Sequence, residues 1–207
     1  MAITNGYATL ADVKLAARIT DTIDDALLEL SIESASRDID AYTERVFYST
    51  GATAIARVYI PQDIYLVETD DIISVTTIKS DTGGNGVFDQ LWAATDFQLE
   101  PLNGRAGGID TPATRIRAVG EYLWPVYEPR NVNANQASVE VTGVFGFATI
   151  PTAIRQATVL ASLRAYKRYE SPTGVLGFSD MGVVRVSVRL DPDVQRLIDP
   201  YRKLRMA

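Results

Sequence analysis

The sequence predicts an α+β protein in which two helical segments, residues 1–51 and 151–207, flank a strand-rich segment, residues 52–150. In the outer segments apolar residues recur at helical spacing, whereas between them the apolar period falls to about 2 and turn residues become frequent. The 207 residues are 46% hydrophobic and 22% charged, which is typical of ordered globular proteins. A chain of this length needs no disulfide or metal to stabilise its core.

Two helices are expected in the first segment. A short one starts at Thr9, with Leu10, Val13 and Ala17 at helical spacing and Asp12 in the first turn, where it suits the helix dipole. A longer one spans 24–46. Its apolar residues recur at alternating steps of four and three, which predicts one narrow buried stripe. The stripe consists of Leu28, Ile32, Ala35, Ile39, Tyr42 and Val46.

The other side of this long helix is charged. Two carboxylates held close together can act as a general acid and base, so an acid/base site is one hypothesis for this side. The favoured interpretation is a solvent-facing side, or a rim that meets a basic neighbour. The residues concerned are Glu29, Glu33, Arg37, Asp40 and Glu44.

Strands are expected throughout the middle segment. Asn85-Gly86 and Gly107-Gly108 supply residues that tolerate positive φ for tight connections. The stretch 128–137 is predicted to be a loop. The expected strands are Ile55–Ile60, Ile72–Ile78, Phe97–Leu99, Arg115–Val119 and Ser138–Val144.

The last segment should open with a helix from Pro151 to about Tyr169. Apolar residues fall on nearly every side of it, so it should be covered all round, by its own core or partly by another subunit. Residues 171–174 break this helix and 183–190 alternate as a strand. A final helix begins at Asp191-Pro192-Asp193 and runs to about Leu204.

Several kinds of chemistry are excluded by what the chain lacks. Without cysteine or histidine it has no disulfide, thiolate nucleophile, imidazole base or metal site built from these residues. It has no P-loop and no Ser-x-x-Lys motif. No signal peptide and no run of about 18 apolar residues is present, so we expect a protein that is made in the cytoplasm and stays soluble.

Two short motifs were tested as binding sites. Asp81–Gly86 matches positions 1, 5 and 6 of a calcium loop, but Gly83 stands at position 3 and Trp92 at position 12, so a hairpin turn is favoured. A basic and aromatic cluster could touch nucleic acid, although a core-and-cap role is favoured because most of the chain is acidic. That cluster is Arg164, Tyr166, Lys167, Arg168 and Tyr169.

The net charge of −6 is unevenly distributed. Residues 1–150 hold 21 acidic and 10 basic residues, whereas residues 151–207 hold 5 acidic and 10 basic ones. One interpretation is that the two ends of the molecule carry opposite potential and attract neighbouring copies or other partners. The alternative is that the imbalance serves solubility alone.

Two blocks of sequence resemble the head-to-tail connector proteins of tailed bacteriophages. The first runs from Tyr7-Ala8-Thr9-Leu10-Ala11-Asp12-Val13 through Ile19-Thr20-Asp21 and Asp24-Asp25-Ala26-Leu27-Leu28 into the long amphipathic helix. The second has Thr142-Gly143-Val144-Phe145-Gly146 before Ile150-Pro151, then 169–175, then Leu190-Asp191-Pro192-Asp193-Val194. Each motif is ordinary, and their order carries the resemblance over roughly half of the chain.

The resemblance implies a non-enzymatic virion protein without cofactors, located at the head-tail junction. A helical bundle made from both ends of the chain would carry a projecting β insertion. Copies would form a dodecameric ring beneath the portal protein, extend the DNA channel and dock the stopper or tail. DNA would pass through without sequence-specific binding, and we hypothesise an acidic channel that lets it slide.

By the same resemblance, the residues expected at the portal or subunit interface lie in 171–190 and the final helix. They are Ser171, Pro172, Gly174, Phe178, Arg185, Arg189, Asp191, Arg196, Arg202, Lys203 and Arg205.

Three alternatives stay open. The protein could be another tail-completion subunit, or a carboxylate-based hydrolase with two carboxylates that converge in a pocket. It could also be a sugar- or protein-binding β module, which predicts Trp92 or Trp124 exposed in a concave site. Packing of both tryptophans in the core is favoured.

Overall fold

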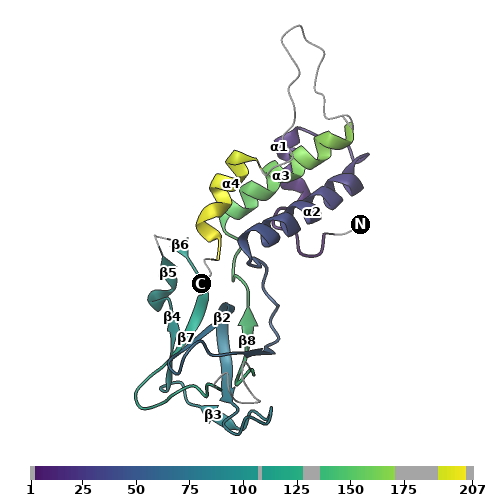
Figure 1. Cartoon of the computed structure of the whole chain (residues 1–207). Coiled ribbons are helices and arrows are strands. Elements are labelled where there is room, and N and C mark those ends of the chain that lie inside the picture. The colour runs from purple at the N-terminus through teal and green to yellow at the C-terminus, as the bar shows by residue number, and fades with distance from the viewer. Residues whose placement is uncertain (1–2, 107–108, 128–135, 171–190, 204–207) are drawn as a thin grey trace. The chain divides into compact units, whose positions relative to one another are not determined.

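The computed structural model describes residues 3–106, 109–127, 136–170 and 191–203 (Figure 1). It combines helices with antiparallel strands, which confirms the α+β class. The chain divides into a helical unit, residues 1–47 and 150–207, and a β unit, residues 48–149. The sequence places these boundaries at 51/52 and 150/151. Within the described ranges no helix is long and apolar enough to cross a membrane.

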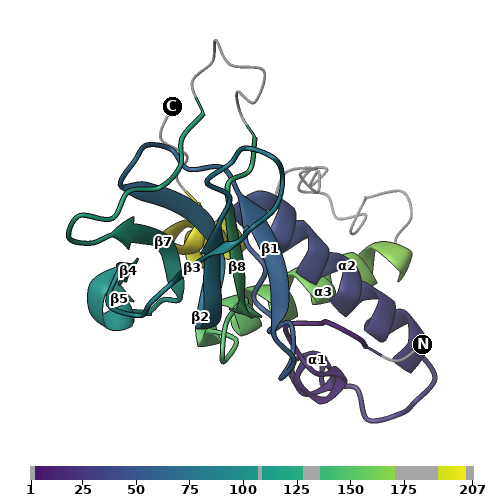
Figure 2. The ribbon, with the colours of Figure 1, turned by 90° about the horizontal axis from the view of Figure 1, so that it is seen from below.

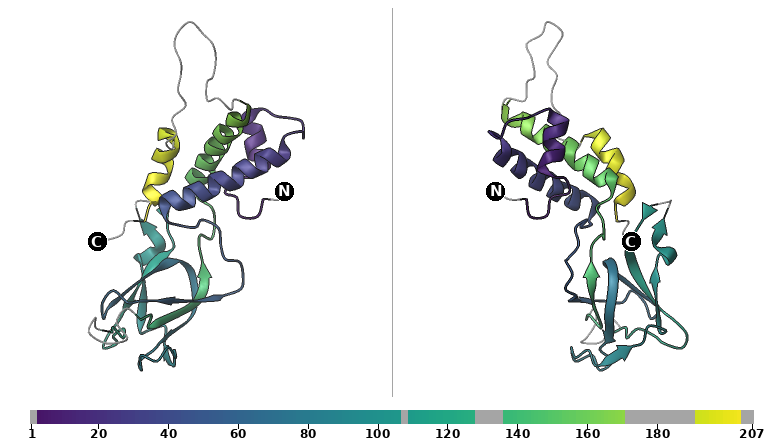
Figure 3. Two further views of the ribbon diagram at one scale, coloured as in Figure 1. Left: turned by 45° about the vertical axis from the view of Figure 1, so that its right-hand side comes forward. Right: turned by 180° about the vertical axis from the view of Figure 1, so that it is seen from behind.

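The helical unit draws its helices from both ends of the chain. Helices α1 (Leu10–Ala17) and α2 (Asp25–Thr43) come from the N-terminal part. Helices α3 (Thr152–Glu170) and α4 (Pro192–Ile198) come from the C-terminal part, and the 3-10 turn η2 (Asp199–Tyr201) follows α4. Helix α3 packs against each of the other three (Figures 1 and 3).

Helix α1 begins where the sequence predicts. The Thr9 hydroxyl accepts a hydrogen bond from the Asp12 N–H, and the Asp12 carboxylate accepts one from the Thr9 N–H, which together form a capping box. Arg18 ends the helix in the left-handed region, at φ 59°.

Helix α2 is shorter than predicted. Its stripe is buried at Leu28, Ile32, Ala35 and Ile39, but Glu44 adopts a left-handed conformation with φ 55° and ends the helix after Thr43. The turn of the chain carries Val46 out of the stripe, and its side chain is 41% exposed. The prediction that the helix and its stripe reach Val46 is therefore wrong.

Helices α3 and α4 differ from expectation in two respects. One side of α3 is exposed, including Gln156 and Leu160, so its own unit does not cover it all round, and partial cover by another subunit stays a prediction. Helix α4 ends at Ile198, because Pro200 has no N–H to continue the helical hydrogen bonds. The strand expected at 183–190 lies outside the described residues.

The β unit contains a six-stranded sheet in the order β1-β8-β2-β7-β4, with β3 paired to β2 (Figure 2). A separate two-stranded sheet joins β5 (Arg105–Ala106) to β6 (Ile109–Asp110). A 3-10 turn, Leu102–Gly104, precedes β5. The strands of the large sheet are β1 (Ile55–Tyr59), β2 (Leu66–Ser80), β3 (Gln90–Trp92), β4 (Phe97–Glu100), β7 (Ala113–Ala118) and β8 (Val139–Phe145).

All five expected strands are present, but the structure also adds elements. Strand β2 starts six residues earlier than expected, and β3, β5 and β6 were not anticipated. Asn85-Gly86 and Gly107-Gly108 are expected in tight connections. Gly86 has φ 79°, and Gly107-Gly108 lies outside the described residues. The expected loop at 128–137 also falls largely outside them.

The core of the β unit contains both tryptophans. The rings of Trp92 and Trp124 stack at 3.8 Å between centroids and 19° between planes. Their exposed fractions are 7% and 1%, which confirms the prediction of core packing. Neither tryptophan presents its ring to a concave binding site, as a sugar-binding module would require. They pack with Val67, Ile78, Ile116, Val139, Val141 and Phe145.

Gly143 permits the close approach of strands β8 and β2. A Cβ added at this position would lie 2.2 Å from the Ser74 carbonyl oxygen, so a side chain would force the strands apart. The pairing register shifts in the same region, between Ile72 and Ser74 and again between Val75 and Thr77.

Candidate functional site: the anchored N-terminal segment and the C-terminal helix

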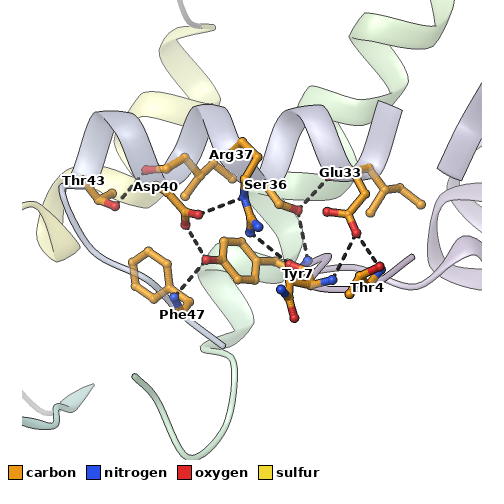
Figure 4. A network of polar contacts seen from close by, with 11 residues as sticks. Thr4, Tyr7, Glu33, Ser36, Arg37, Asp40, Thr43 and Phe47 are labelled. Carbon is orange, nitrogen blue, oxygen red and sulfur yellow. Dashed lines mark hydrogen bonds and ion pairs between the residues drawn. The ribbon is translucent and has the colours of Figure 1, made fainter. Parts of the chain in front are cut away.

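The N-terminal segment is fixed to α2 through Tyr7 (Figure 4). Tyr7 is 1% exposed, and its hydroxyl donates to the Asp40 carboxylate. The same hydroxyl accepts a hydrogen bond of 2.9 Å from the Phe47 N–H. The Tyr7 N–H donates to Ser36 Oγ at 3.0 Å. Burial raises the pKa of Asp40 and also that of Tyr7.

The charged side of α2 holds the residues that precede Tyr7. The Glu33 carboxylate accepts hydrogen bonds from the N–H groups of Thr4 and Asn5, at 2.6 and 3.0 Å. Arg37 donates to the Asn5 carbonyl and forms an ion pair of 2.9 Å with Asp40. For Glu33 and Asp40 the interpretation as a solvent-facing side is corrected, because both bind a segment of their own chain and are only partly exposed, whereas 42% of the Arg37 side chain stays exposed. These contacts hold Glu33 and Asp40 in structural roles.

Three aromatic rings join distant segments of the helical unit. Phe47 meets Tyr7 edge to face at 5.5 Å between centroids, and meets Tyr201 at 5.7 Å. Near this cluster the Lys203 N–H donates to the Thr43 carbonyl at 2.9 Å. The N-terminal segment, the end of α2 and the turn after α4 therefore share one anchor.

Of the expected interface residues that are described, most contact their own chain. Asp191 caps α4 and pairs with Arg164 at 2.5 Å. The Arg202 guanidinium lies 5.7 Å from the centroid of the Tyr42 ring. Arg196 is exposed on the outer side of α4. Lys203 is half-buried, and the remaining expected residues lie outside the described ranges: Ser171, Pro172, Gly174, Phe178, Arg185, Arg189 and Arg205.

The basic and aromatic cluster at the end of α3 does not form one continuous stripe. Tyr166 is 8% exposed and donates to the Asp24 carboxylate at 2.7 Å, while Arg164 is paired with Asp191. Lys167, Arg168 and Tyr169 are exposed. The core role favoured for the tyrosines is therefore confirmed for Tyr166.

The β unit offers a pocket but no pair of converging carboxylates in it. The pocket has a volume of about 390 Å³, and none of the residues that line it is titratable. Its wall includes Ile72, Leu99, Pro101 and Phe147. Nothing in this lining resembles the acid and base of a carboxylate-based hydrolase.

Asp81 is fully buried and organises the turn that follows β2. Its carboxylate accepts hydrogen bonds from the N–H groups of Gly83, Gly84, Asn85 and Gly86, at 2.7 to 3.3 Å. These donors occupy the oxygens that a calcium ion would need. In the described part of the chain no group of three or more acidic residues is placed to hold a metal.

Comparison with known proteins finds one family model that matches part of the chain. Residues 7–78 match the family described as phage gp6-like head-tail connector protein. The likeness to phage head-to-tail connectors is confirmed. The matched region contains Tyr7, α1, α2, β1 and nearly all of β2. No curated protein matches the chain.

Two solved structures share the fold of this chain. A chain from the neck of an empty gene transfer agent (GTA) particle, computed with C6 symmetry, is 18% identical with a TM-score of 0.55. A chain from the virion of a native GTA particle is 17% identical with a TM-score of 0.51. Each likeness covers 100% of this chain and 95% of the other. At these identities the likeness shows the fold.

Proposed function

We propose that this protein is a structural head-to-tail connector of a phage-like particle. Copies form a ring of twelve beneath the portal protein, extend the DNA channel and dock the stopper or tail. The observation that carries the proposal is the match of residues 7–78 to the connector family. It is supported by the likeness of the whole chain to a protein of a particle neck computed with C6 symmetry.

In this proposal the helical segments, 1–51 and 151–207, form the connector core as a bundle, and 52–150 is the insertion. Packing of α3 against α1, α2 and α4 supports such a core, because it brings both ends of the chain together. A ring requires heterologous contacts, in which one surface meets a different surface of the next copy. The surplus of basic residues in 151–207 and of acidic residues in 1–150 can set that orientation.

The segment 171–190 and the final helix are proposed to contact the portal or a neighbouring copy. Arg196 is the described residue best placed for this, because α4 directs its side chain outward. The protein would stay in the particle and would let DNA pass without sequence-specific contacts. The β unit supports this last point, because its 12 acidic and 6 basic residues give it a net charge of −6, which repels phosphate.

Particles that lack this protein test the proposal directly. Electron microscopy should show DNA-filled heads without tails, and the normal gene should restore the tails. Tailed particles in the absence of the protein would rule out a connector role. Mixing with purified portal distinguishes the alternatives, because a connector should bind the portal whereas another tail-completion subunit should bind only the tail.

A point substitution tests portal docking better than truncation after Tyr169. Truncation would also remove Val194, Ile198 and Tyr201, which are buried in the helical unit. Arg196→Glu reverses a charge on an exposed surface and should weaken attachment to purified portal. Arg18→Glu, an exposed charge reversal after α1, is the matched control. Equal attachment of both variants and the normal protein would remove Arg196 from the interface.

A further inference from the structure

We propose that an exposed apolar patch on the β unit, framed by carboxylates, binds the neck or tail protein that follows the connector. The partner surface would present apolar side chains surrounded by lysine or arginine. This inference rests on the proposed connector function and assigns a surface to one of its two docking steps. We call the surface the rim patch, which consists of Ile64, Tyr65, Leu91, Tyr122 and Leu123.

Contacts in the structure bring the rim patch together from three segments. The Trp124 N–H donates to the Ile64 carbonyl, and the Ala118 N–H donates to the Tyr65 carbonyl, each at 2.8 Å. The Tyr122 ring lies 5.7 Å from the ring of Trp92, the last residue of β3, and the exposed Leu91 belongs to the same edge strand. The five side chains are 40% to 59% exposed. Exposed apolar residues gathered in this way are typical of protein–protein contact sites.

The stacked tryptophans give the patch a fixed base. Trp92 contacts the Tyr122 ring, Trp124 follows Leu123 in the chain, and the two buried tryptophan rings stack at 3.8 Å. The patch is therefore supported by core packing and needs little ordering when a partner binds, which favours affinity.

The charge around the patch is negative. Asp63, Asp89 and Glu121 are exposed, and each is within two residues of a member of the rim patch. Every arginine or lysine of the β unit whose side chain is described forms an ion pair, so these cations do not cancel the exposed carboxylates. The pairs are Arg57–Asp70, Lys79–Glu140, Arg115–Glu68 and Arg117–Glu100.

The carboxylates select the kind of partner. They repel phosphate, so nucleic acid and anionic lipid are disfavoured. They also repel the same patch on a second copy, which disfavours a symmetric dimer through this surface. A protein surface with apolar residues inside a basic frame matches both properties. The C-terminal part of the chain is basic, so a connector can use opposite charges to distinguish its two unlike partners.

Two variants of this protein, each produced in place of the normal one, test the inference. Tyr122→Ser with Leu123→Ser removes the apolar centre, and Asp89→Lys with Glu121→Lys reverses the frame. Both should enter heads at normal levels, measured by immunoblot, but lower the yield of tailed particles about ten-fold or more. Higher salt should slow tail attachment to normal heads and affect charge-reversed heads less.

Matched controls are available elsewhere on the chain. Leu102→Ser changes an exposed leucine of the β unit outside the rim patch, and Asp38→Lys reverses an exposed charge on α2. Both should support normal tail attachment. Thermal unfolding of the charge-reversal variants should match the normal protein, because these side chains are exposed. The Tyr122 and Leu123 variant should still unfold in one cooperative transition, at a lower temperature, because about half of each side chain is covered and Tyr122 packs against Trp92.

Each other outcome contradicts the inference in a recognisable way. Normal tail attachment by both rim variants would overturn it while leaving the connector function intact. Absence of the variants from heads, or loss of self-association in analytical ultracentrifugation, would show that the patch serves the portal or a second copy. If the normal protein itself is absent from heads, the proposed function fails as well.

Discussion

At the scale of single residues, Tyr7 joins the N-terminal segment to α2 and to the chain that follows it. Its hydroxyl group has two partners. It donates to Asp40 on α2 and accepts from the N–H of Phe47, which follows α2. Water has little access to either partner, so it cannot fully replace a hydrogen bond that is lost there. Tyr7 thereby fixes the path of the segment that precedes α1.

Tyr7→Phe should lower the free energy of unfolding by about 1–3 kcal/mol, because the buried Phe47 N–H loses its acceptor and the Asp40 carboxylate loses one of its two donors. For a chain of this size that corresponds to a fall in Tm of about 2–4 °C for each kcal/mol. Differential scanning calorimetry measures the change. Tyr65→Phe removes a hydroxyl from a half-exposed ring and should leave Tm unchanged, and an equal fall in both variants would contradict the role of the anchor.

At the scale of elements, Asp12 connects the start of α1 to α3. Its carboxylate closes the capping box with Thr9 and also binds the Arg155 guanidinium, at 2.9 and 2.5 Å. Hydrogen bonding to Arg155 is the main reason why the pKa of Asp12 falls from 3.8 to about 2. The ionised carboxylate therefore stabilises the packing of a helix that has only eight residues.

A pH dependence follows from this shift. The folded state holds the pKa of Asp12 below its unfolded value, so the folded state binds fewer protons. The resulting stability is complete above about pH 4 and is lost as the pH falls towards 2. Urea unfolding of Asp12→Asn should show lower stability at pH 7 and a shallower decline below pH 4. Asp38→Asn is the control, and the same shallow decline there would assign the effect to net charge.

The elements differ in how far their sequence reveals them. Periodic apolar patterns predict α1, most of α2 and five strands, because one buried face determines each of them. Helix α3 is predicted from Pro151 and the apolar run that follows it. The first half of β2 escapes prediction because Glu68, Thr69, Asp70 and Asp71 interrupt the alternation, although two of these are buried. Strand β3 has only three residues, too few to show a period.

The candidate site was harder to predict than the fold. The contacts of Tyr7 with Asp40 and Phe47 span 33 and 40 residues of sequence, so no local pattern reports them. The rim patch is assembled from three segments by pairing and ring stacking, which the sequence does not show. The end of α2 depends on one left-handed residue, Glu44, that is not the glycine or asparagine usual in that position.

At the scale of the whole molecule, the charges are divided between its units. The β unit has a net charge of −6, and the helical unit contains 14 acidic and 14 basic residues. Within the helical unit the surplus of cations belongs to the C-terminal part and the surplus of anions to the N-terminal part. A molecule built in this way favours contacts between unlike surfaces, which close into a ring when the rotation between copies permits.

The number of copies in that ring is the last testable consequence. The connector proposal specifies twelve copies. Native mass spectrometry of the protein assembled on purified portal should therefore show an added mass of twelve chains of 22.6 kDa. Arg196→Glu should reduce the amount of complex without changing its stoichiometry, because it weakens docking and leaves the contacts between copies in place. A ring of any other copy number would contradict the proposed dodecamer, and a single bound copy would contradict the ring itself.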